Sequence, residues 1–461
     1  MGCYSIPAHV KEYIRRTGYP YAADDMAPFI ARWGDMLTAS GSFYDYEERV
    51  NGTPMKVHRR SIRPASRVAN EWASLIMNDR TTIATEDTAC NEWLDAYLER
   101  CNFRSLGQDL VKKEFALGTG AWALWVDTDA GKLYPRRYDA RMVLPLSWDD
   151  DGVSECAFCT RASWRGRELD QLQLHVVDQS TGTYHIRTAW WDMDGERVVP
   201  DGVIEDFDTR SAEPCFAIVK PAIENTCVDL SPYGQSVYAD AEDAMQGVDL
   251  CFDAIFNEVD LAKMRIFISD ILVDYKDSDG RRQALPFGRD NTVFRKVMSN
   301  DDLVSTFAPA MRTESQISAY RMALRTMGDL CGLGLEYFDI DEHGGIKTAT
   351  EVSSDNSALM RNIRKHENAL ACAIKRIVHA SLHFAREFLG ERLPPEGEVT
   401  VTFDDSIVTD TASEKAQDMA ELNVAMNPWE YRMKWYGEDE ETARANVPGA
   451  PETLRDDPFS E

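Results

Sequence analysis

Two short motifs in this chain contain cysteine or histidine at a spacing that could bind metal or support catalysis. Cys156 and Cys159 form a C-x-x-C pair, but no second pair or histidine cluster completes a zinc site, so we interpret them as structural cysteines in a strand. His366 is followed by Glu367, but the second histidine of an H-E-x-x-H zinc motif is missing. We therefore expect His366 and Glu367 on the solvated face of a long helix.

Carboxylates that could bind a catalytic metal occur at residues 149–151 and at Asp404 and Asp405. The first group is three consecutive acids on a predicted loop, which do not all point toward one cation, so a solvated charge run is expected. Asp404 and Asp405 end a predicted strand and raise the hypothesis of a metal-dependent nuclease or hydrolase. The sequence contains no G-x-x-x-x-G-K-[ST] phosphate loop and no defensible Ser-His-Asp arrangement. It therefore predicts a protein that is not an enzyme and needs neither cofactor nor metal.

Composition limits the class of protein further. The 461 residues carry a formal net charge of −28, so the chain as a whole repels DNA, and any contact with nucleic acid is expected to be local or transient. The length corresponds to roughly three domains, and a hydrophobic content of 44% supplies a large core. The ten cysteines are scattered, which indicates reduced thiols. No run approaches the ~20 apolar residues of a membrane span, so no membrane partner is expected.

The most regular element is a helix predicted at about 234–265, which opens at Ser231-Pro232-Tyr233-Gly234. Its apolar residues recur at steps of three and four, which is the period of one helix face. The other face is acidic and carries Asp240, Glu242, Asp243, Asp249, Asp253, Glu258 and Asp260. Spacing alone therefore predicts a core helix with a solvated acidic face.

The remaining pattern mixes helices and strands and predicts an α+β fold. Helices are expected at about 10–16, 30–37, 63–79, 90–116, 314–331, 347–389, 416–426 and 428–435, strands throughout a β-rich insertion at 117–220, and a last strand at 399–405. A small β segment at 266–310 has strand candidates at 266–273 and 292–297, with a hairpin-turn signal at 277–280 between them. An acidic loop with two glycines, 336–345, separates the last two long helices.

Four collinear blocks resemble a known family. They are RPASRVANEWASLIMNDRTTI from Arg63, SPYGQSVYADAEDAMQGVDLCFDAIFNEV from Ser231, GLGLEYFDIDEHGGIKTATEVSSDN from Gly332, and the weaker TFDDSIVTDTASEKAQDM from Thr402. With Tyr436-Gly437 downstream, they span about residues 60–445. In this order they resemble the portal proteins of tailed double-stranded-DNA phages, of the siphophage type from Gram-positive hosts.

The resemblance implies a phage portal fold with a mixed wing domain, a two-helix stem, a small β-containing clip, a long wing helix and a short α-helical crown. By resemblance the wing would be 1–233 and 346–410, the stem helices 234–265 and 312–331, the clip 266–311, the tunnel loop 332–345, and the crown with its tail 411–461. The order of helix, β module, helix, loop and long helix that periodicity predicts agrees with this arrangement. The first stem helix would pack against its neighbours and line a pore.

The resemblance also implies a function, namely a dodecameric ring at one capsid vertex through which DNA is packaged by the terminase motor and later ejected. The implied partners are further copies of the chain, double-stranded DNA in transit, the terminase large subunit, the major capsid and scaffolding proteins, and head-completion or adaptor proteins. The implied location is the capsid vertex of the virion, after assembly in the host cytoplasm. Two alternatives stay open: another phage head-morphogenesis or adaptor protein, and the metal-dependent nuclease or hydrolase.

By resemblance, the candidate DNA-channel residues lie on the second stem helix and in the loop that follows it. They are Arg321, Arg325, Asp339, Asp341, Glu342, His343, Gly344, Gly345 and Lys347. A channel wall that bound phosphate strongly would stall moving DNA, whereas a mostly repulsive wall with a few basic contacts lets the duplex slide. We expect the basic residues among them to supply those contacts and the glycines to let the loop move.

Overall fold

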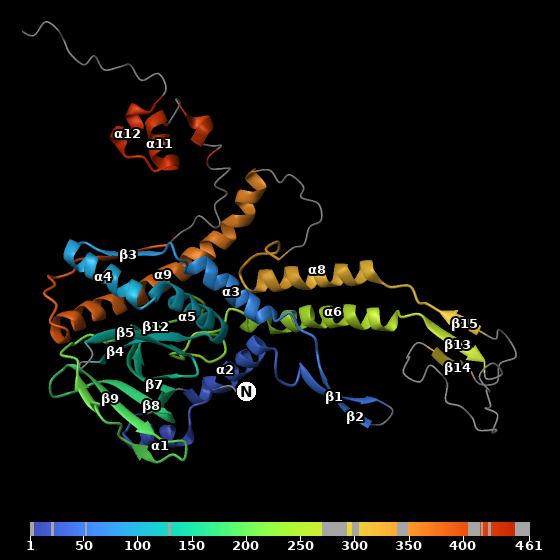
Figure 1. Cartoon of the computed structure of the whole chain (residues 1–461), viewed down its shortest axis with the longest axis horizontal. Helices are drawn as coiled ribbons and strands as arrows, with labels where there is room; N and C mark the ends of the chain where they lie inside the picture. The colour runs from blue at the N-terminus through green and yellow to red at the C-terminus, as the bar shows by residue number, and fades with distance from the viewer. Residues whose placement is uncertain are drawn as a thin grey trace, which may run out of the picture.

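Two antiparallel helices project as an arm from a body of packed helices and sheets (Figure 1). The arm consists of α6 (Glu242–Leu261) and α8 (Thr313–Leu330). The structure is a computed structural model and describes residues 4–19, 23–50, 53–127, 131–269, 293–296, 304–338, 349–403, 415, 418–422 and 426–447. Helices and strands are interspersed along the chain, which confirms the predicted α+β class.

The centre of the body is built from four helices, α3 (Pro64–Ile76), α4 (Thr88–Arg100), α5 (Phe103–Leu117) and the 40-residue α9 (Ala349–Phe388). The single helix expected at 90–116 is wrong, because the chain breaks between α4 and α5. Asn102 adopts a left-handed conformation there, with φ of 49°, which asparagine tolerates better than most residues. The break lets α5 pack on α3 and on the sheet that follows it.

The strands predicted between residues 117 and 220 are present and form two antiparallel sheets. The larger sheet contains β6 (Val143–Asp149), β7 (Gly152–Trp164), β8 (Arg167–Val177), β9 (Tyr184–Trp191), β10 (Arg197–Val198) and β11 (Asp206–Asp208). The smaller sheet contains β4 (Gly120–Asp127), β5 (Lys132–Asp139) and β12 (Phe216–Val219). Helices α5 and α9 pack against the smaller sheet and join it to the helical centre.

The N-terminal region forms two helices and a hairpin. Helices α1 (Ala8–Arg16) and α2 (Ala23–Thr38) include the two helices predicted there. The hairpin of β1 (Asp45–Val50) and β2 (Thr53–His58) is not among the predicted elements. Before α1, Tyr4 Oη donates a hydrogen bond to Cys159 Sγ at 3.2 Å. Cys156 and Cys159 are buried in β7, as expected for structural cysteines.

A small sheet follows the far end of α6 and consists of β13 (Arg265–Ser269), β14 (Val293–Lys296) and β15 (Val304–Phe307). β13 is central and pairs with β15 in antiparallel register but with β14 in parallel register. The predicted hairpin between the first two strands is therefore wrong, because the two strands of a hairpin must be antiparallel. Residues 277–280, which carry the turn signal, lie outside the described residues.

The C-terminal part contains β16 (Val399–Thr402), which pairs with β3 (Thr82–Thr85), and the helices α11 (Pro428–Tyr436) and α12 (Glu440–Ala445). The helix predicted at 428–435 is confirmed, whereas α12 is not among the predicted elements. The two helices pack on each other. Asp404 and Asp405 lie outside the described residues, and the helix expected at 416–426 is described only in part.

The first arm helix begins at Glu242, not at 234 as predicted, because the preceding residues bond to the body. The Gly234 amide donates to Thr119 Oγ1 at 3.0 Å and the Val237 amide donates to the Phe115 carbonyl oxygen at 3.0 Å. A Cβ on Gly234 would lie 2.3 Å from the carbonyl oxygen of Gly118, so only glycine permits this approach. The arm is thus joined to the turn between α5 and β4.

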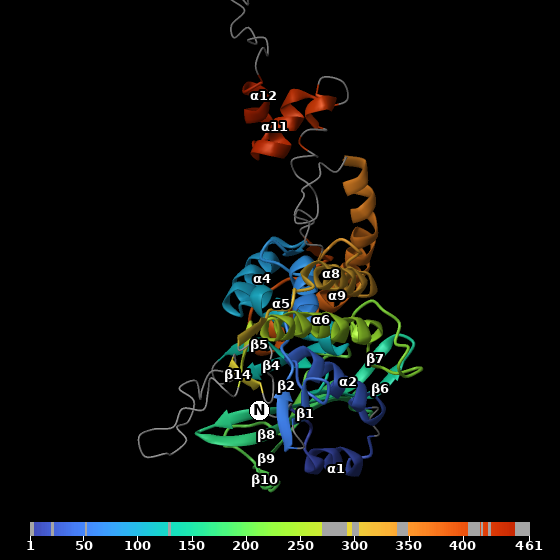
Figure 2. The ribbon, with the colours of Figure 1, turned by 90° about the vertical axis from the view of Figure 1, so that its right-hand side faces the viewer.

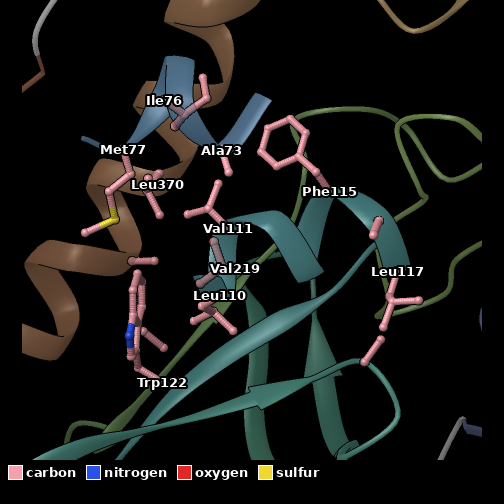
Figure 3. Close-up of a cluster of buried hydrophobic side chains, with 14 of the residues drawn as sticks. Ala73, Ile76, Met77, Leu110, Val111, Phe115, Leu117, Trp122, Val219 and Leu370 are labelled. Carbon is pink, nitrogen blue, oxygen red and sulfur yellow. The ribbon is translucent and has the colours of Figure 1, made fainter. Parts of the chain in front are cut away.

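The hydrophobic core lies where α3, α5, β4 and α9 meet. Figure 3 shows Ile76, Phe115, Trp122 and Leu370 in this cluster, one from each of these elements. Each of these four side chains is buried. The core therefore joins the β sheets to the long helix that follows the predicted loop.

His366 belongs to this core, so the prediction of a solvated face for His366 and Glu367 is wrong. Both residues are buried. The His366 ring makes edge contacts with Trp72 and Phe115, with centroids 4.9 Å apart in each pair, and its Nδ1 accepts a hydrogen bond from the Ala222 amide at 3.0 Å. Burial lowers the pKa of His366 to about 4, so the ring is neutral and acts as a packing residue.

Glu114 on α5 is a buried acid without a compensating cation among the described residues, and it should make the stability of the fold depend on pH. Its Oε2 has no hydrogen-bond partner within the described part of the chain, and burial raises the pKa of the carboxyl well above its usual range. The folded chain therefore keeps a proton that the unfolded chain releases above pH ~4.3, so stability falls as pH rises, by about 1.4 kcal/mol per pH unit while Glu114 stays protonated.

We expect Glu114→Gln to remove this slope, because an amide does not ionise. Melting temperatures measured at pH 5, 6.5 and 8 should show the variant gaining on the wild type as pH rises. Glu99→Gln, at an exposed position on α4, is the control and should follow the wild type. A difference in melting temperature between wild type and Glu114→Gln that stays constant across this pH range would contradict a protonated Glu114 in the folded chain.

Candidate functional site

The arm is the candidate functional site, because the predicted channel residues Arg321 and Arg325 lie on α8. Seen from the end of the arm, α8 lies above α6 and the β1–β2 hairpin lies below it (Figure 2). The same arrangement is visible from the side (Figure 1). α6 is therefore in the middle, packed against α8 on one side and facing the N-terminal segment on the other.

A buried carboxylate joins α6 to the N-terminal segment. The Asp249 side chain is fully buried. Its Oδ2 accepts hydrogen bonds from Tyr44 Oη at 2.8 Å and Ser61 Oγ at 2.6 Å, and its Oδ1 accepts one from the Ile62 amide at 2.9 Å. Burial raises the pKa of Asp249, and these three hydrogen bonds oppose the increase. Both ends of the segment that carries the hairpin are thus bound to one side chain.

Arg60 extends this contact along α6. Its Nη1 lies 3.3 Å from Asp253 Oδ1 and 3.2 Å from Asn257 Oδ1, and its Nη2 lies 3.7 Å from Asp260 Oδ2. The guanidinium carbon also lies 5.5 Å from the centroid of the Phe256 ring, within the range of a cation–π contact. One cation therefore contacts polar side chains from three successive turns of the helix, of which Asp253 and Asp260 are acids.

The two ends of α6 are also held by ion pairs. Arg32 Nε of α2 lies 3.0 Å from Glu242 Oε1 at the start of the helix. Arg312, just before α8, makes a bidentate pair with Glu258, with Nη2 at 2.7 Å from Oε2 and Nε at 3.2 Å from Oε1. A bidentate pair fixes orientation as well as distance, so Arg312 sets how α8 returns along α6.

The expectation of a solvated acidic face on α6 is therefore wrong for Glu242, Asp249, Asp253 and Glu258. These four side chains are 15% exposed or less. Their partners come from residues 32–62 and from residue 312, which periodicity within a single helix does not reveal. These four acids therefore attach α6 to the N-terminal segment and to the start of α8.

Large apolar side chains remain exposed on the arm and around its far end. They are Leu250, Phe256, Val259, Met264, Val304, Phe307, Met311, Ile317, Met322 and Leu330. Single exposed apolar residues are normal, but ten of them on two helices and the sheet at their end make the arm a candidate interaction surface.

Arg321 and Arg325 line the same open depression on α8, of about 650 Å³. They are one helical turn apart and lie among Ile317, Met322 and Leu335. Arg325 Nη2 is 4.0 Å from Glu336 Oε1, at the start of the predicted loop. Two guanidinium groups over one depression could contact successive phosphates of a polyanion.

The other channel candidates lie outside the described residues. They are Asp339, Asp341, Glu342, His343, Gly344, Gly345 and Lys347. The described residues before them are firmly attached: Phe338 is buried, Tyr337 Oη donates to Glu71 Oε2 at 2.9 Å, and the Arg67 guanidinium lies 4.9 Å from the Phe338 ring centroid. The last described residues before the predicted loop are therefore packed against α3.

The structure brings together one cysteine–histidine pair that the sequence analysis missed. His175 Nδ1 lies 3.3 Å from Cys215 Sγ, and both side chains are buried. Burial lowers the pKa of His175 to about 3 and raises the pKa of Cys215 to about 12, so the pair stays neutral and is not an activated nucleophile. No signal in the sequence places these two residues together.

No group of three or more His, Cys, Asp or Glu side chains in the described ranges is placed to hold a metal ion. None of the described helices is both long and apolar enough to span a membrane.

Comparison with known proteins gives a family match over most of the chain. A family model described as phage portal protein, SPP1 Gp6-like, matches residues 42–445. No curated protein matches the chain. Among solved structures, a chain from the virion of a native gene transfer agent particle is similar at 14% identity and a TM-score of 0.43, with 93% of this chain and 98% of that chain covered.

Two chains from the necks of gene transfer agent particles are also similar to this chain. The neck of an empty particle, computed with C6 symmetry, gives 13% identity and a TM-score of 0.41. The neck of a native particle, computed with C12 symmetry, gives 14% identity and a TM-score of 0.38. Each covers 81% of this chain and 88% of its own length.

The Asp249 contact generates a prediction about stability. We expect Asp249→Ala to lower the free energy of unfolding by about 2 to 4 kcal/mol, because it leaves buried donors of Tyr44, Ser61 and Ile62 without an acceptor. The measurement is chemical denaturation of the dilute chain followed by tryptophan fluorescence. Asp243→Ala, at an exposed position in the first turn of the same helix, should cost less than about 1 kcal/mol. Equal losses in the two variants would contradict the role of Asp249.

Proposed function

This chain belongs to the SPP1 Gp6-like family of phage portal proteins, and we propose that it forms the dodecameric ring through which DNA enters and leaves the capsid. The observation that carries the proposal is the family match over residues 42–445. The arm supports it, because its exposed apolar side chains would be covered when identical chains pack side by side. A ring built this way uses two different surfaces of each subunit.

The parts of the chain correspond to the parts of a portal subunit as follows. The arm helices Glu242–Leu261 and Thr313–Leu330 form the stem, and the sheet of β13, β14 and β15 belongs to the clip at its end. The body with its β sheets and α9 forms the wing. The helices α11 and α12 belong to the crown. The first stem helix thus begins at Glu242 and not, as periodicity predicts, at residue 234.

In the proposed ring α8 faces the channel, and α6, which the sequence analysis expected to line the pore, lies behind it. The support is electrostatic: Glu242, Asp253 and Glu258 of α6 are paired with cations of the same chain, and Arg321 and Arg325 line an open depression on α8, where Arg325 also lies 4.0 Å from Glu336. These two residues, with Lys347 and His343, make brief contacts with phosphates. The acids of the loop and the net charge of −28 keep DNA from binding tightly. The loop from Asp339 to Gly345 projects into the channel.

The ring has a structural and translocating role and no catalytic activity of its own. The terminase large subunit supplies the motor and docks at the clip. Major capsid and scaffolding proteins surround the wing, and head-completion or adaptor proteins join the ring to the tail. The ring therefore resides at the capsid vertex of the virion and is assembled in the host cytoplasm.

Assembly is the first test of this proposal. With 52.1 kDa per chain, we expect a particle of about half a megadalton or more, because the exposed apolar side chains of the arm favour association. Light scattering across salt and protein concentrations measures the mass, and negative-stain images show whether the particle is a ring. A monomer at every concentration would overturn the proposal.

The channel assignment is tested by the double variant Arg321→Gln and Arg325→Gln. We expect the variant to fold and form rings but to package less DNA per particle in a complementation assay, because two phosphate contacts per subunit are lost. Deletion of residues 341–345 should impair packaging more strongly, and Lys347→Ala alone should impair it less.

Arg16→Gln is the matched control for the channel variants. Arg16 lies on α1, where its side chain is 76% exposed and pairs with Glu12. The control should package DNA at wild-type yield. Normal packaging by both the double variant and the loop deletion would contradict the placement of the channel wall.

A further inference from the structure

The β1–β2 hairpin extends away from the body on the side of α6 opposite α8 (Figures 1 and 2). Among the described strands, β1 and β2 pair only with each other. Its described side chains are exposed or half-buried. An isolated two-stranded hairpin is at best marginally stable in water, so this hairpin needs support that its own strands do not provide.

The base of the hairpin is rigidly attached to the arm. Tyr44, directly before β1, and Ser61, shortly after β2, both donate hydrogen bonds to Asp249 of α6. The Arg59 guanidinium lies over two aromatic rings, 4.2 Å from the Phe43 centroid and 5.3 Å from the Tyr46 centroid. The attachment fixes where the hairpin points and leaves the strands beyond it uncovered.

The two faces of the hairpin differ in character. The register pairs Tyr46 with Val57 and Glu48 with Met55, so these four side chains share one face, which is mostly apolar. The opposite face carries Asp45, Glu47, Arg49, Lys56 and His58, with Asp45 Oδ1 and His58 Nδ1 2.8 Å apart. A polar face opposite an apolar face is the pattern of a sheet that is solvated on one side and packed on the other.

No described part of the same chain covers the apolar face fully, since Met55 is 51% exposed and Tyr46 and Val57 are half-buried. We infer that a second copy of this chain covers it, at the open side of α6 that carries Leu250 and Ala254. The inference rests on the proposed ring. It assigns to the hairpin the role of a clamp between adjacent subunits.

The location of the receiving surface follows from symmetry. A rotation that relates subunits of a ring leaves the height along the ring axis unchanged, and in the proposed ring the stem runs along that axis. The base of the hairpin is attached at Asp249 and its strands extend from there toward the far end of the arm (Figure 1), so it meets the neighbouring arm at the height of Asp249 or farther along α6. Leu250, which is 52% exposed, and the exposed Ala254 lie within that stretch of the helix.

The direction in which these residues face also fits. Successive residues of an α-helix are about 100° apart around its axis. Asp249 and Asp253 face the chain's own hairpin base, so Leu250 and Ala254 face sideways, away from it. Sideways is the direction in which the next subunit of a ring lies. An apolar hairpin face and an apolar helix side thus form the two unlike surfaces that such an interface needs.

Oxidation of methionine by hydrogen peroxide tests the proposal directly. We expect Met55 to be oxidised at least about five-fold more slowly in the assembled ring than in the dilute subunit, since oxidation follows exposure. Met193 lies after β9 and is 48% exposed, so it is a matched control, and its rate should not change. If the oxidation rate of Met55 relative to that of Met193 were the same in the ring and in the dilute subunit, the inference would be overturned. Failure of the wild-type chain to form rings would instead overturn the proposed function.

Substitutions on the two faces provide a second test. Met55→Glu and Lys56→Gln change the net charge by the same amount at adjacent positions that face opposite ways. We expect Met55→Glu to raise the concentration needed for half-assembly by about tenfold or more, equivalent to about 1.4 kcal/mol, and Lys56→Gln to leave it within about twofold. Both should keep the wild-type melting temperature, because the positions are exposed. Equal effects of the two substitutions on assembly would overturn the inference.

The receiving surface is tested by Leu250→Glu. This substitution should weaken assembly as strongly as Met55→Glu without changing the melting temperature of the dilute subunit. Assembly of Leu250→Glu at wild-type concentrations would overturn the assignment of α6 as the receiving side.

Discussion

The arm of this protein depends on one buried carboxylate. Asp249 is removed from water in the middle of α6 and receives three hydrogen bonds from Tyr44, Ser61 and the Ile62 amide. Burying an acid without partners would be costly, so α6 and the N-terminal segment form this contact together or not at all. The contact sets where the hairpin leaves the arm, and the neighbouring pairs of Arg60 and Arg312 set the position of α6 relative to the hairpin base and α8. The geometry of the candidate site follows from this group of charges.

Sequence periodicity predicted the existence of the main helices well, because apolar residues at steps of three and four report a buried face. It did not predict what would lie on the acidic face of α6. The partners of those acids are about 190 to 210 residues away in the chain for Tyr44, Arg60 and Ser61. The same limit explains His366, whose polar ring is buried because Trp72, Phe115 and the Ala222 amide surround it. A single residue carries no pattern that reveals such partners.

Two further differences between the predicted and the observed strands concern hairpin turns. The β1–β2 hairpin had a usable signal, since Asn51-Gly52 lies between two alternating runs and is a strong hairpin-turn dipeptide. The turn signal at 277–280 suggested a hairpin, but β13 and β14 pair in parallel, which local sequence does not specify. Of the candidate site, the sequence placed Arg321 and Arg325 on one helix, and the structure shows that they line the same depression.

The pairing of the α6 acids changes how the negative charge of the chain should be understood. A net charge of −28 does not mean that every acid repels DNA, because Glu242, Asp253 and Glu258 each have a cation of the same chain within about 3.3 Å. At such distances the two charges largely cancel beyond the screening length of about 8 to 10 Å. In the proposed channel, repulsion of DNA would therefore come from acids that lack such partners. Because the paired acids of α6 bind their own chain, we propose that α8, with Arg321 and Arg325, is the stem helix that faces the DNA.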